Sequence, residues 1–550
     1  MAFDRRRRAY QERLEQGRAL SPQASHFVPR ERTLDLLHAV LRPGDRVCLE
    51  GDNQKQADFL ARELVRVDPA RIHDLHMVQS TLALPEHVEV FERGIASRLD
   101  FAFSGPQAKP LYQLVTSHKA RVGAIHTYLE LFSRYFLDLI PDVCLLVAEA
   151  CDEAGNIYTG FNTEDTAMIC EAARFNLGII VVQVEKKLDR LPRVDIPADW
   201  IDFIVVTGEP CHIEPLFTRD PARITPMQLL MGMMVLKGIY QPYHVQVLNH
   251  GIGFPTAAIE LLLPTYGAEL GMKGECCTHW ALNPHPTMIP AIEAGFVEKI
   301  HCFGSEPGMA DYIMARGDIF PVGPDGTMRS SRATAHMAGL YAIDLFIGAT
   351  LQVDRYGNSS TAVNGRIAGF GGAPNLGGTP PGRRHFTEAF RKAGYRGPDG
   401  LPYGRKLVVQ ITPSVSEKKA IPVFVEELDA VEMARQGIFT EPPVMIAGDQ
   451  VTHIVTEHGI AYLDRCPDLA TRMQAVAAIA GDTAVGATLD AAGRDRLRKA
   501  SIFQTPEDLG IDVATAQPDR LAARSMQDLV DQSGGLYTVP PGLMGGGGEG

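Results

Sequence analysis

Two glycines, Gly251 and Gly253, stand close together in the segment Leu248–Thr256 (LNHGIGFPT). Apolar residues over 245–249 predict a strand before them, and the pattern over 256–263 predicts a helix after them. Glycine lets a ligand approach the backbone, and the unpaired N–H groups at a helix start attract negative charge. Such groups could stabilise the oxyanion formed when a thioester is attacked. A tight strand-to-helix turn without a ligand fits the pattern at least as well, and a glycine pair alone is weak evidence for a dinucleotide site.

A second segment with chemically active side chains, Gly274–Pro286 (GECCTHWALNPHP), follows that helix. In a parallel sheet the strand after the helix would lie alongside the first strand. Glu275 is a candidate nucleophile there, and His279 and His285 are candidate acids or bases. An ordinary surface loop is the alternative. The two histidines lack further ligands at zinc spacing, so we expect no metal.

Two more segments place polar or flexible residues next to a predicted strand. Asn53 and Gln54 follow a predicted strand at 46–50 and open a helix. This position suits a phosphate or pantetheine contact, and it equally suits an ordinary capped helix. The loop Gly369–Asn375 (GFGGAPN) is too rich in glycine for a helix or strand, so it makes a sharp turn or admits a ligand. Arg366, just before it, is a candidate carboxylate anchor.

The elements that must position these residues alternate between short apolar runs and amphipathic helices. Strands are predicted at 46–50, 143–149, 178–184, 202–206, 245–249, 299–303, 346–353, 407–412 and 451–456. Alternation of this kind, with strands that look buried, predicts an α/β fold with mostly parallel sheets flanked by helices.

An internal repeat indicates how many domains there are. The pattern D-x-x-G-N-x-x-T occurs at Asp152–Thr159 and at Asp354–Thr361, each time after an apolar strand. The strand-turn-helix starts CLEGDN and VLNHGIG recur in the same order, which indicates duplicated halves. We therefore predict two large α/β domains, 1–235 and 236–550, in place of the roughly three or four that the chain length suggests.

Composition and charge exclude several classes of protein. Hydrophobic residues make up 45% and charged residues 22% of the chain, the balance of a folded soluble protein. The net charge of −13 argues against nucleic acid or an anionic membrane as the main partner. Nine cysteines without a CxxC pair suggest reduced thiols, and the basic start lacks the apolar run of a signal peptide, so we expect a cytoplasmic protein. No apolar stretch is long enough to span a membrane, and neither GxSxG nor a Walker A motif occurs.

Longer motifs resemble known families. GIGFPT and GFGGAPN resemble the two glycine loops of the family I coenzyme A transferases, and Glu275 falls where those enzymes carry a nucleophilic glutamate. A closer resemblance is to the malonate decarboxylase α-subunit family, and it covers essentially the whole chain. It is carried by EGDNQKQADFLAREL (50–64), GAIHTYLEL (123–131), HWALNPHPTMIPAIEAG (279–295), DLFIGATLQVDRYGNSSTAVNGRIAGFGGAPN (344–375) and SGGLY (533–537).

This resemblance implies two coenzyme A transferase-like domains and an exchange of acyl groups on an acyl carrier protein. Acetyl-carrier and malonate would give malonyl-carrier and acetate, and other subunits would then decarboxylate the malonyl thioester. The carrier thiol would belong to a prosthetic group derived from dephospho-coenzyme A, with no cofactor or metal bound directly by this chain. The expected partners are the carrier, the decarboxylase subunits, malonate and acetate. Arg5–Arg8 are a candidate docking strip, because carrier proteins are usually acidic.

The resemblance also implies roles for single residues and leaves alternatives open. Catalysis is expected at Gly251, Gly253, Glu275 and His279, and substrate binding at Asn53, Gln54, Asn283, His285, Arg366, Gly371, Gly372 and Asn375. Arg366, Arg329 and Arg332 are candidates for the second carboxylate of malonate. Either Glu275 takes the acetyl group as an anhydride, or malonate attacks the acetyl thioester directly. A free coenzyme A transferase or hydrolase, a citrate lyase α-type subunit and a non-catalytic scaffold are the competing functions.

Overall fold

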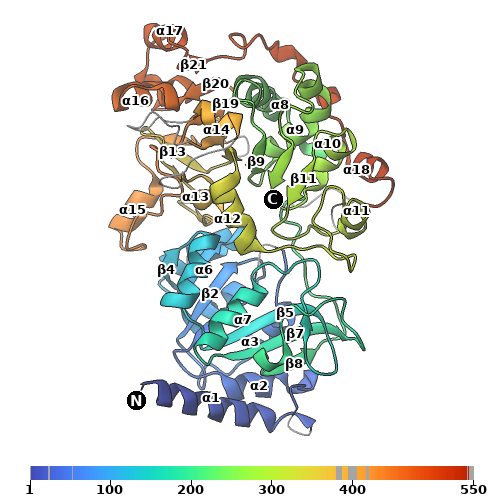
Figure 1. Cartoon of the computed structure of the whole chain (residues 1–550). Coiled ribbons are helices and arrows are strands. Elements are labelled where there is room, and N and C mark those ends of the chain that lie inside the picture. Colours follow the sequence, from blue (N-terminus) through green and yellow to red (C-terminus); the bar gives the residue numbers. More distant parts are fainter. Residues whose placement is uncertain are drawn as a thin grey trace, which may run out of the picture.

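Two eight-stranded sheets, one in each half of the chain, form the frame of the molecule. The computed structural model describes residues 2–22, 25–51, 54–379, 387–393, 405–416, 420–541 and 543. In Figure 1 the first half lies below the second, and helix α1 (Ala2–Arg18) lies at the bottom.

The first sheet has the strand order β4-β3-β2-β1-β5-β7-β8, and β6 pairs with β5. Its strands are β1 (Arg46–Leu49), β2 (Leu75–Thr81), β3 (Ala96–Phe103), β4 (Arg121–Ile125), β5 (Val143–Cys151), β6 (Ile157–Tyr158), β7 (Ile179–Lys187) and β8 (Phe203–Val206). The helices around it are α2 (Thr33–Val40), α3 (Asp58–Leu64), α4 (Glu86–Glu92), α5 (Ala108–Thr116), α6 (Tyr128–Leu137) and α7 (Thr166–Phe175). The main path is parallel throughout. Helices on both faces bury both sides of such strands, which explains continuous apolar runs such as VCLLVAEAC in β5.

The second sheet has the order β11-β10-β9-β12-β17-β19-β20-β21. Its strands are β9 (Val247–His250), β10 (His279–Ala281), β11 (Lys299–His301), β12 (Leu345–Gly348), β17 (Leu407–Ile411), β19 (His453–Thr456), β20 (Gly459–Tyr462) and β21 (Phe503–Gln504). At one edge the pairs β19–β20 and β20–β21 are antiparallel, and the other pairs between described strands of this sheet are parallel. The helices α8 (Pro226–Val235), α9 (Phe254–Leu262), α10 (Ile289–Glu293), α12 (Arg332–Ala342) and α16 (Leu469–Ile479) pack around it, and short strands such as β15 (Ala362–Val363) and β16 (Arg366–Ile367) form small hairpins. The α/β fold with mostly parallel sheets is confirmed.

The repeated D-x-x-G-N segment folds identically in the two halves. Asp152 accepts hydrogen bonds from the backbone N and the Nδ2 of Asn156, both at 2.8 Å. Asp354 accepts the same pair from Asn358, at 2.9 and 2.8 Å. The glycine before each asparagine has a φ of 89° or 87°, which favours glycine there. This shared turn supports the interpretation of the chain as two duplicated halves.

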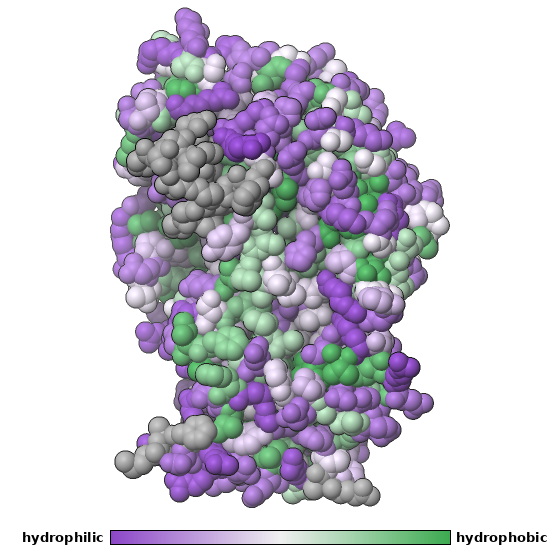
Figure 2. Space-filling model, viewed as in Figure 1, coloured by the Kyte–Doolittle hydropathy of each residue, from purple (hydrophilic) through white to green (hydrophobic). Residues whose placement is uncertain are grey.

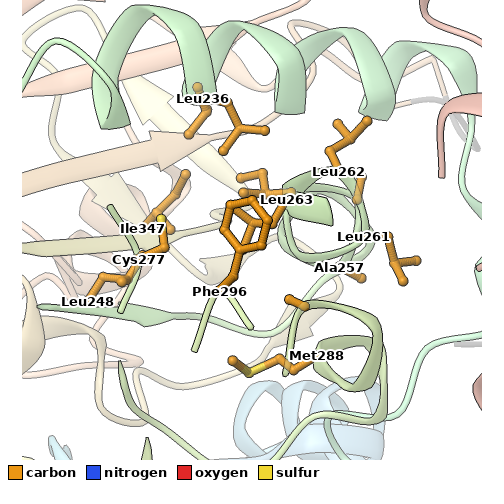
Figure 3. Packing of buried hydrophobic residues seen from close by; sticks show 14 of the residues in the cluster. Leu236, Leu248, Ala257, Leu261, Leu262, Leu263, Cys277, Met288, Phe296 and Ile347 are labelled. Atoms are coloured by element: carbon orange, nitrogen blue, oxygen red, sulfur yellow. The ribbon is translucent and has the colours of Figure 1, made fainter. Parts of the chain in front are cut away.

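Most buried apolar residues cluster with others of the same half, although Ile367, Met433 and Phe439 of the second half pack in a cluster of the first. The core of the second half begins at Ile224 and includes the methionine-rich helix α8. Figure 3 shows part of it, in which Leu248 and Ile347 of the sheet and Leu262 of α9 gather around Phe296. Helix α8 packs in this core although it lies before 235/236, where we predicted the division between the domains, and that division stays a prediction.

The carboxyl edges of the two sheets face each other across the junction of the halves. Gln54, which follows β1, donates from Nε2 to Glu306, which follows β11, at 2.7 Å. Arg332 at the start of α12 is buried and forms ion pairs with Glu164 and, at 3.0 Å, with Asp165. Figure 1 shows α12 at this junction. Ligands of parallel sheets bind outside the carboxyl ends of the strands, so the junction is where a site is expected.

The surface facing the viewer in Figure 2 is largely hydrophilic, and an apolar area lies over α12. In the part of the chain that the structure describes, no helix combines the length and apolarity needed to cross a membrane. All nine cysteines are free thiols, and most are buried.

Candidate active site

The glycine loop joins the end of β9 to the start of α9, at the carboxyl edge of the second sheet. Gly251 donates its N–H to Ile347 O at 2.7 Å, and a Cβ at Gly251 would lie only 3.1 Å from Gly348 Cα. Gly253 has a φ of 152°. Among the described residues, the N–H groups of Ile252 and Gly253 have no acceptor. Gly251 is thus needed to pack against β12, and the N–H groups able to meet an anion belong to Ile252 and Gly253.

A buried carboxylate in α9, Glu260, organises the next part of the site. Its Oε1 accepts from Nδ1 of His250 and Nδ1 of His285, each at 2.9 Å, and its Oε2 accepts from Thr287. The Tyr240 hydroxyl and His250 Nε2 are 2.8 Å apart. Burial alone would raise the pKa of Glu260, but the charge of His285 and the hydrogen bonds from both histidines outweigh it and hold that pKa well below its ordinary value. Glu260 is therefore ionised.

This network determines which nitrogen His285 presents to the junction. Because Nδ1 is held by Glu260, the other ring nitrogen, Nε2, faces away from the carboxylate. His285 Nε2 is buried and has no hydrogen-bond partner among the described residues. The ring stacks on Phe217, with centroids 4.9 Å apart. A fixed ring with one unused polar atom is suited to binding a ligand.

Asn283 is the second buried polar residue without a partner. It follows β10, and the pairing of Trp280 with Leu248, continued for three residues, brings Asn283 level with Gly251 on the neighbouring strand. Its side chain is fully buried, and neither the amide oxygen nor the amide nitrogen has a partner in the described part of the chain. An unsatisfied buried polar group costs roughly 1–3 kcal/mol, so such an amide is expected where a ligand completes its hydrogen bonds.

A second buried carboxylate, Glu306, links the two halves beside His285. It accepts hydrogen bonds from Gln54 Nε2 at 2.7 Å and from Phe217 N at 3.1 Å. It also accepts from the N and Oγ1 of Thr218, at 3.0 and 2.8 Å. Burial raises the pKa of Glu306 even though these hydrogen bonds oppose the shift. Glu306 fixes Gln54 and the segment around Thr218 at the site.

Two of the four expected catalytic residues lie elsewhere. Glu275 is exposed in the turn that precedes β10, and His279 is the exposed first residue of that strand. Both stand at the amino edge of the sheet, and the strand separates them from Asn283 and the glycine loop at the carboxyl edge. We expected the residues before β10 to reach the site, but Asn283, which follows β10, lies there instead. The geometry therefore gives no support to an anhydride on Glu275.

We expect Glu275→Ala to leave the rate of acyl exchange close to that of the unmodified protein. An exposed turn at the amino edge offers this carboxylate no contact with a substrate held at the carboxyl edge. The measurement is the initial rate of acetate release from acetyl-carrier and malonate, with trapping by hydroxylamine as a second readout. A large loss of rate, or a label recovered on Glu275, would contradict this placement.

The three arginines expected to hold malonate are placed differently from that expectation. Arg329 pairs with Asp325 at 2.7 Å. Arg332 is held by the two acidic residues already described. Arg366 is an exposed residue of β16, in a hairpin that packs against α5. None of them joins Asn283 and His285 in the described structure.

The second glycine loop serves the contact between the halves. Gly371 donates its N–H to Ala102 O of the first half at 2.9 Å. A Cβ at Gly372 would lie 2.3 Å from the ring of His336, and the Asn375 amide is 3.1 Å from His336 Nδ1. The glycines here let the loop backbone approach the His336 ring closely, which fits the interpretation of this loop as a sharp turn. Asn53 lies outside the described residues.

Of the expected site residues, the structure thus gathers Gly251, Gly253, Gln54, Asn283 and His285. Sequence reasoning missed Glu260 and Glu306. The signal for Glu260 is a single charge within the apolar run AAIELLL, and the signal for Glu306 is its place just after a predicted strand. Among the described residues, no group of three or more His, Cys, Asp or Glu side chains is arranged so that it could hold a metal ion.

Comparison with known proteins agrees with the resemblance over nearly the full length. Residues 2–543 match the family model described as malonate decarboxylase, alpha subunit, transporter. A Malonomonas rubra protein named acetyl-S-ACP:malonate ACP transferase is 56% identical over 519 residues, covering 93% of this chain and 94% of that protein.

Solved structures give the same result. A crystal structure of a Pseudomonas malonate decarboxylase hetero-tetramer in complex with malonate contains a chain 52% identical, with a TM-score of 0.95 over 98% of this chain and 99% of that one. The malonate decarboxylase α subunit of Acinetobacter baumannii is 49% identical, with a TM-score of 0.94 over 99% and 100%. The putative citrate lyase α subunit of Streptococcus mutans, at 16% identity and a TM-score of 0.57 over 83% and 82%, shares the fold alone. This chain belongs to the malonate decarboxylase α-subunit family.

Proposed function

We propose that this chain is an acyl carrier protein transferase, in which acetyl-S-carrier and malonate give malonyl-S-carrier and acetate. The observation that carries the proposal is the meeting of three unused sets of polar atoms at the facing carboxyl edges. These are the N–H groups of Ile252 and Gly253, the amide of Asn283, and Nε2 of His285. The name of the Malonomonas relative supports the same reaction.

The chemistry needs an oxyanion to be stabilised twice. A carboxylate oxygen of malonate attacks the acetyl carbonyl of the thioester, the C–S bond breaks, and a mixed anhydride and the carrier thiolate result. The thiolate then attacks the malonyl carbonyl of the anhydride, and acetate leaves. Donors from the glycine loop and Asn283 are suited to the tetrahedral oxygen of each step, and losing one such donor typically costs about 2.7–4 kcal/mol.

Direct attack by malonate is favoured over an enzyme nucleophile by the residues at this edge. The residue that follows β10 into the site is Asn283, whose amide is not a nucleophile. Both oxygens of Glu260 and both oxygens of Glu306 accept hydrogen bonds within the fold. Malonate brings its own carboxylate, so the reaction needs no covalent intermediate on this chain.

We propose the carrier and the decarboxylase subunits as the protein partners of this chain. The carrier would deliver the thioester on its dephospho-coenzyme A-derived arm as a substrate, and decarboxylase subunits would consume the malonyl product. The hetero-tetrameric Pseudomonas relative supports an assembly of several subunits. The exposed residues Arg5–Arg8 lie on α1, at the far end of the first half in Figure 1, so a docking surface nearer the junction suits the carrier better. The free thiols suit a cytoplasmic protein.

The test is acetate release by the purified chain supplied with acetyl-carrier and malonate. We expect release that depends on both substrates, with transfer of labelled malonate to the carrier. Arms with acetyl-coenzyme A in place of the carrier, or citrate in place of malonate, separate the competing transferases. A preference for free coenzyme A or citrate, or the absence of release in every arm, would overturn the proposal.

A further inference from the structure

The segment Leu216–Arg219 crosses from the first half of the chain onto the site of the second. Phe217 stacks on the His285 ring, and Thr218 donates to Glu306, as described above. Arg219 is the next residue along. Its guanidinium carbon lies 5.8 Å from the ring centroid of Phe254, the first residue of α9. Arg219 therefore stands at the helix start that carries the glycine loop.

Arg219 differs from Arg329 and Arg332 in what it binds. Its Nη1 donates to two carbonyl oxygens, those of Leu216 at 3.1 Å and Thr218 at 2.7 Å. Among the residues that the structure describes, no carboxylate forms an ion pair with it. By contrast, Arg329 and Arg332 are each paired with acidic side chains.

The surroundings of Arg219 favour an incoming anion. The side chain is half-buried, and burial lowers its pKa, since removing a cation from water is unfavourable without a counter-charge. Glu306, Glu260 and Arg223 lie near enough to act on Arg219 through their charges. Both carboxylates already accept hydrogen bonds within the fold, and Arg223 adds a second positive charge. The guanidinium N–H groups of Arg219 other than those on Nη1 can bind a carboxylate in a two-pronged geometry. The amino end of α9 adds positive potential at the same place.

We propose that Arg219 holds the distal carboxylate of malonate, the one that does not attack the thioester, and so selects a dicarboxylate over acetate. The inference rests on the proposed function. With one carboxylate on Arg219, the other is free to reach the acyl carbonyl beside Asn283 and the glycine loop. Acetate has no second carboxylate, so it gains nothing from Arg219.

The experiment compares two acceptors with the same acetyl-carrier, malonate and isotopically labelled acetate. For Arg219→Met we expect the KM for malonate to rise on the order of 100-fold, from the loss of a charge-assisted fork. Exchange of labelled acetate should stay close to that of the unmodified protein. Arg219→Lys keeps the positive charge but cannot form two parallel hydrogen bonds to a carboxylate. Its KM for malonate should therefore lie between those of the unmodified protein and Arg219→Met. Arg329→Met is the matched control and should leave both acceptors unchanged.

Binding is measured independently of turnover by thermal unfolding. Malonate should raise the Tm of the unmodified protein and not that of Arg219→Met, because a ligand stabilises only the state that binds it. An unchanged KM for malonate in Arg219→Met, or equal losses with malonate and acetate, would overturn the role of Arg219. Failure of the unmodified protein in both exchange assays would instead refute the proposed function.

Discussion

Asn283→Ala is expected to lower kcat for acyl exchange roughly 10²–10³-fold, the usual loss when one oxyanion donor is removed. Asn283 stands level with Gly251 at the carboxyl edge, and its buried amide has no partner among the described residues. Its N–H is therefore unused until a tetrahedral oxygen forms. Because no hydrogen bond within the fold is lost, the Tm of this variant should change little.

The measurement is single-turnover transfer from acetyl-carrier to malonate, together with thermal unfolding. Asn364→Ala, in an exposed turn, is the matched control and should retain full activity. A Tm that falls steeply in Asn283→Ala would show a structural amide. A kcat near that of the unmodified protein would show that Asn283 does not contact the reacting oxygen.

Glu260→Gln is expected to lower both activity and stability. A glutamine at this position would turn an N–H group toward donors that Glu260 now accepts from His250, His285 and Thr287. Breaking a buried charged pair from one side costs up to roughly 3–5 kcal/mol. His285 would lose the contact that orients its ring, and a misplaced site group typically costs on the order of 100-fold in rate.

The stability difference should depend on pH in a definite direction. The pKa of Glu260 is held below its ordinary value in the folded state. The ionised form therefore stabilises the fold fully above the ordinary glutamate pKa of about 4.3, and this contribution is lost as the pH falls further, toward the folded pKa. We expect the gap in free energy of unfolding between the unmodified protein and Glu260→Gln to be constant near neutrality and to shrink below that point.

Urea unfolding of both proteins across this pH range measures the gap. Glu269→Gln serves as the control, because Glu269 is exposed and, among the described residues, its ion pair is with Arg520 on the surface. Glu269→Gln should change the free energy of unfolding by less than about 1 kcal/mol at every pH. A gap for Glu260→Gln that does not change between neutral and acidic pH would contradict an ionised Glu260.

Much of the fold could be predicted because its signals are local. Buried parallel strands need apolar residues at successive positions, as in β5 and β7, and a helix must return the chain to the same edge. The D-x-x-G-N turn is closed by hydrogen bonds between residues four apart, so its pattern marks both halves. The glycine loop is a local signal too, since Gly251 and Gly253 stand between adjacent elements.

The residues on either side of β10 could not be assigned correctly from local sequence signals. Glu275 precedes the strand and Asn283 follows it, and both are close to it in sequence. Judged by residue type alone, the carboxylate of Glu275 is the better candidate for a nucleophile than the amide of Asn283. A strand, however, carries its two flanking residues to opposite edges of the sheet, and here the carboxyl edge faces the other half.

The amino-acid sequence by itself determined the α/β alternation, the repeated D-x-x-G-N turn and the family, because each depends on neighbours along the chain or on long motifs. Only the tertiary structure decided which polar residues share a site. Gln54, Thr218 and Glu306 come from separate segments, and hydrogen bonds to one buried carboxylate bring them together. The reason is physical: a charge excluded from water must find its partners wherever the packed halves supply them.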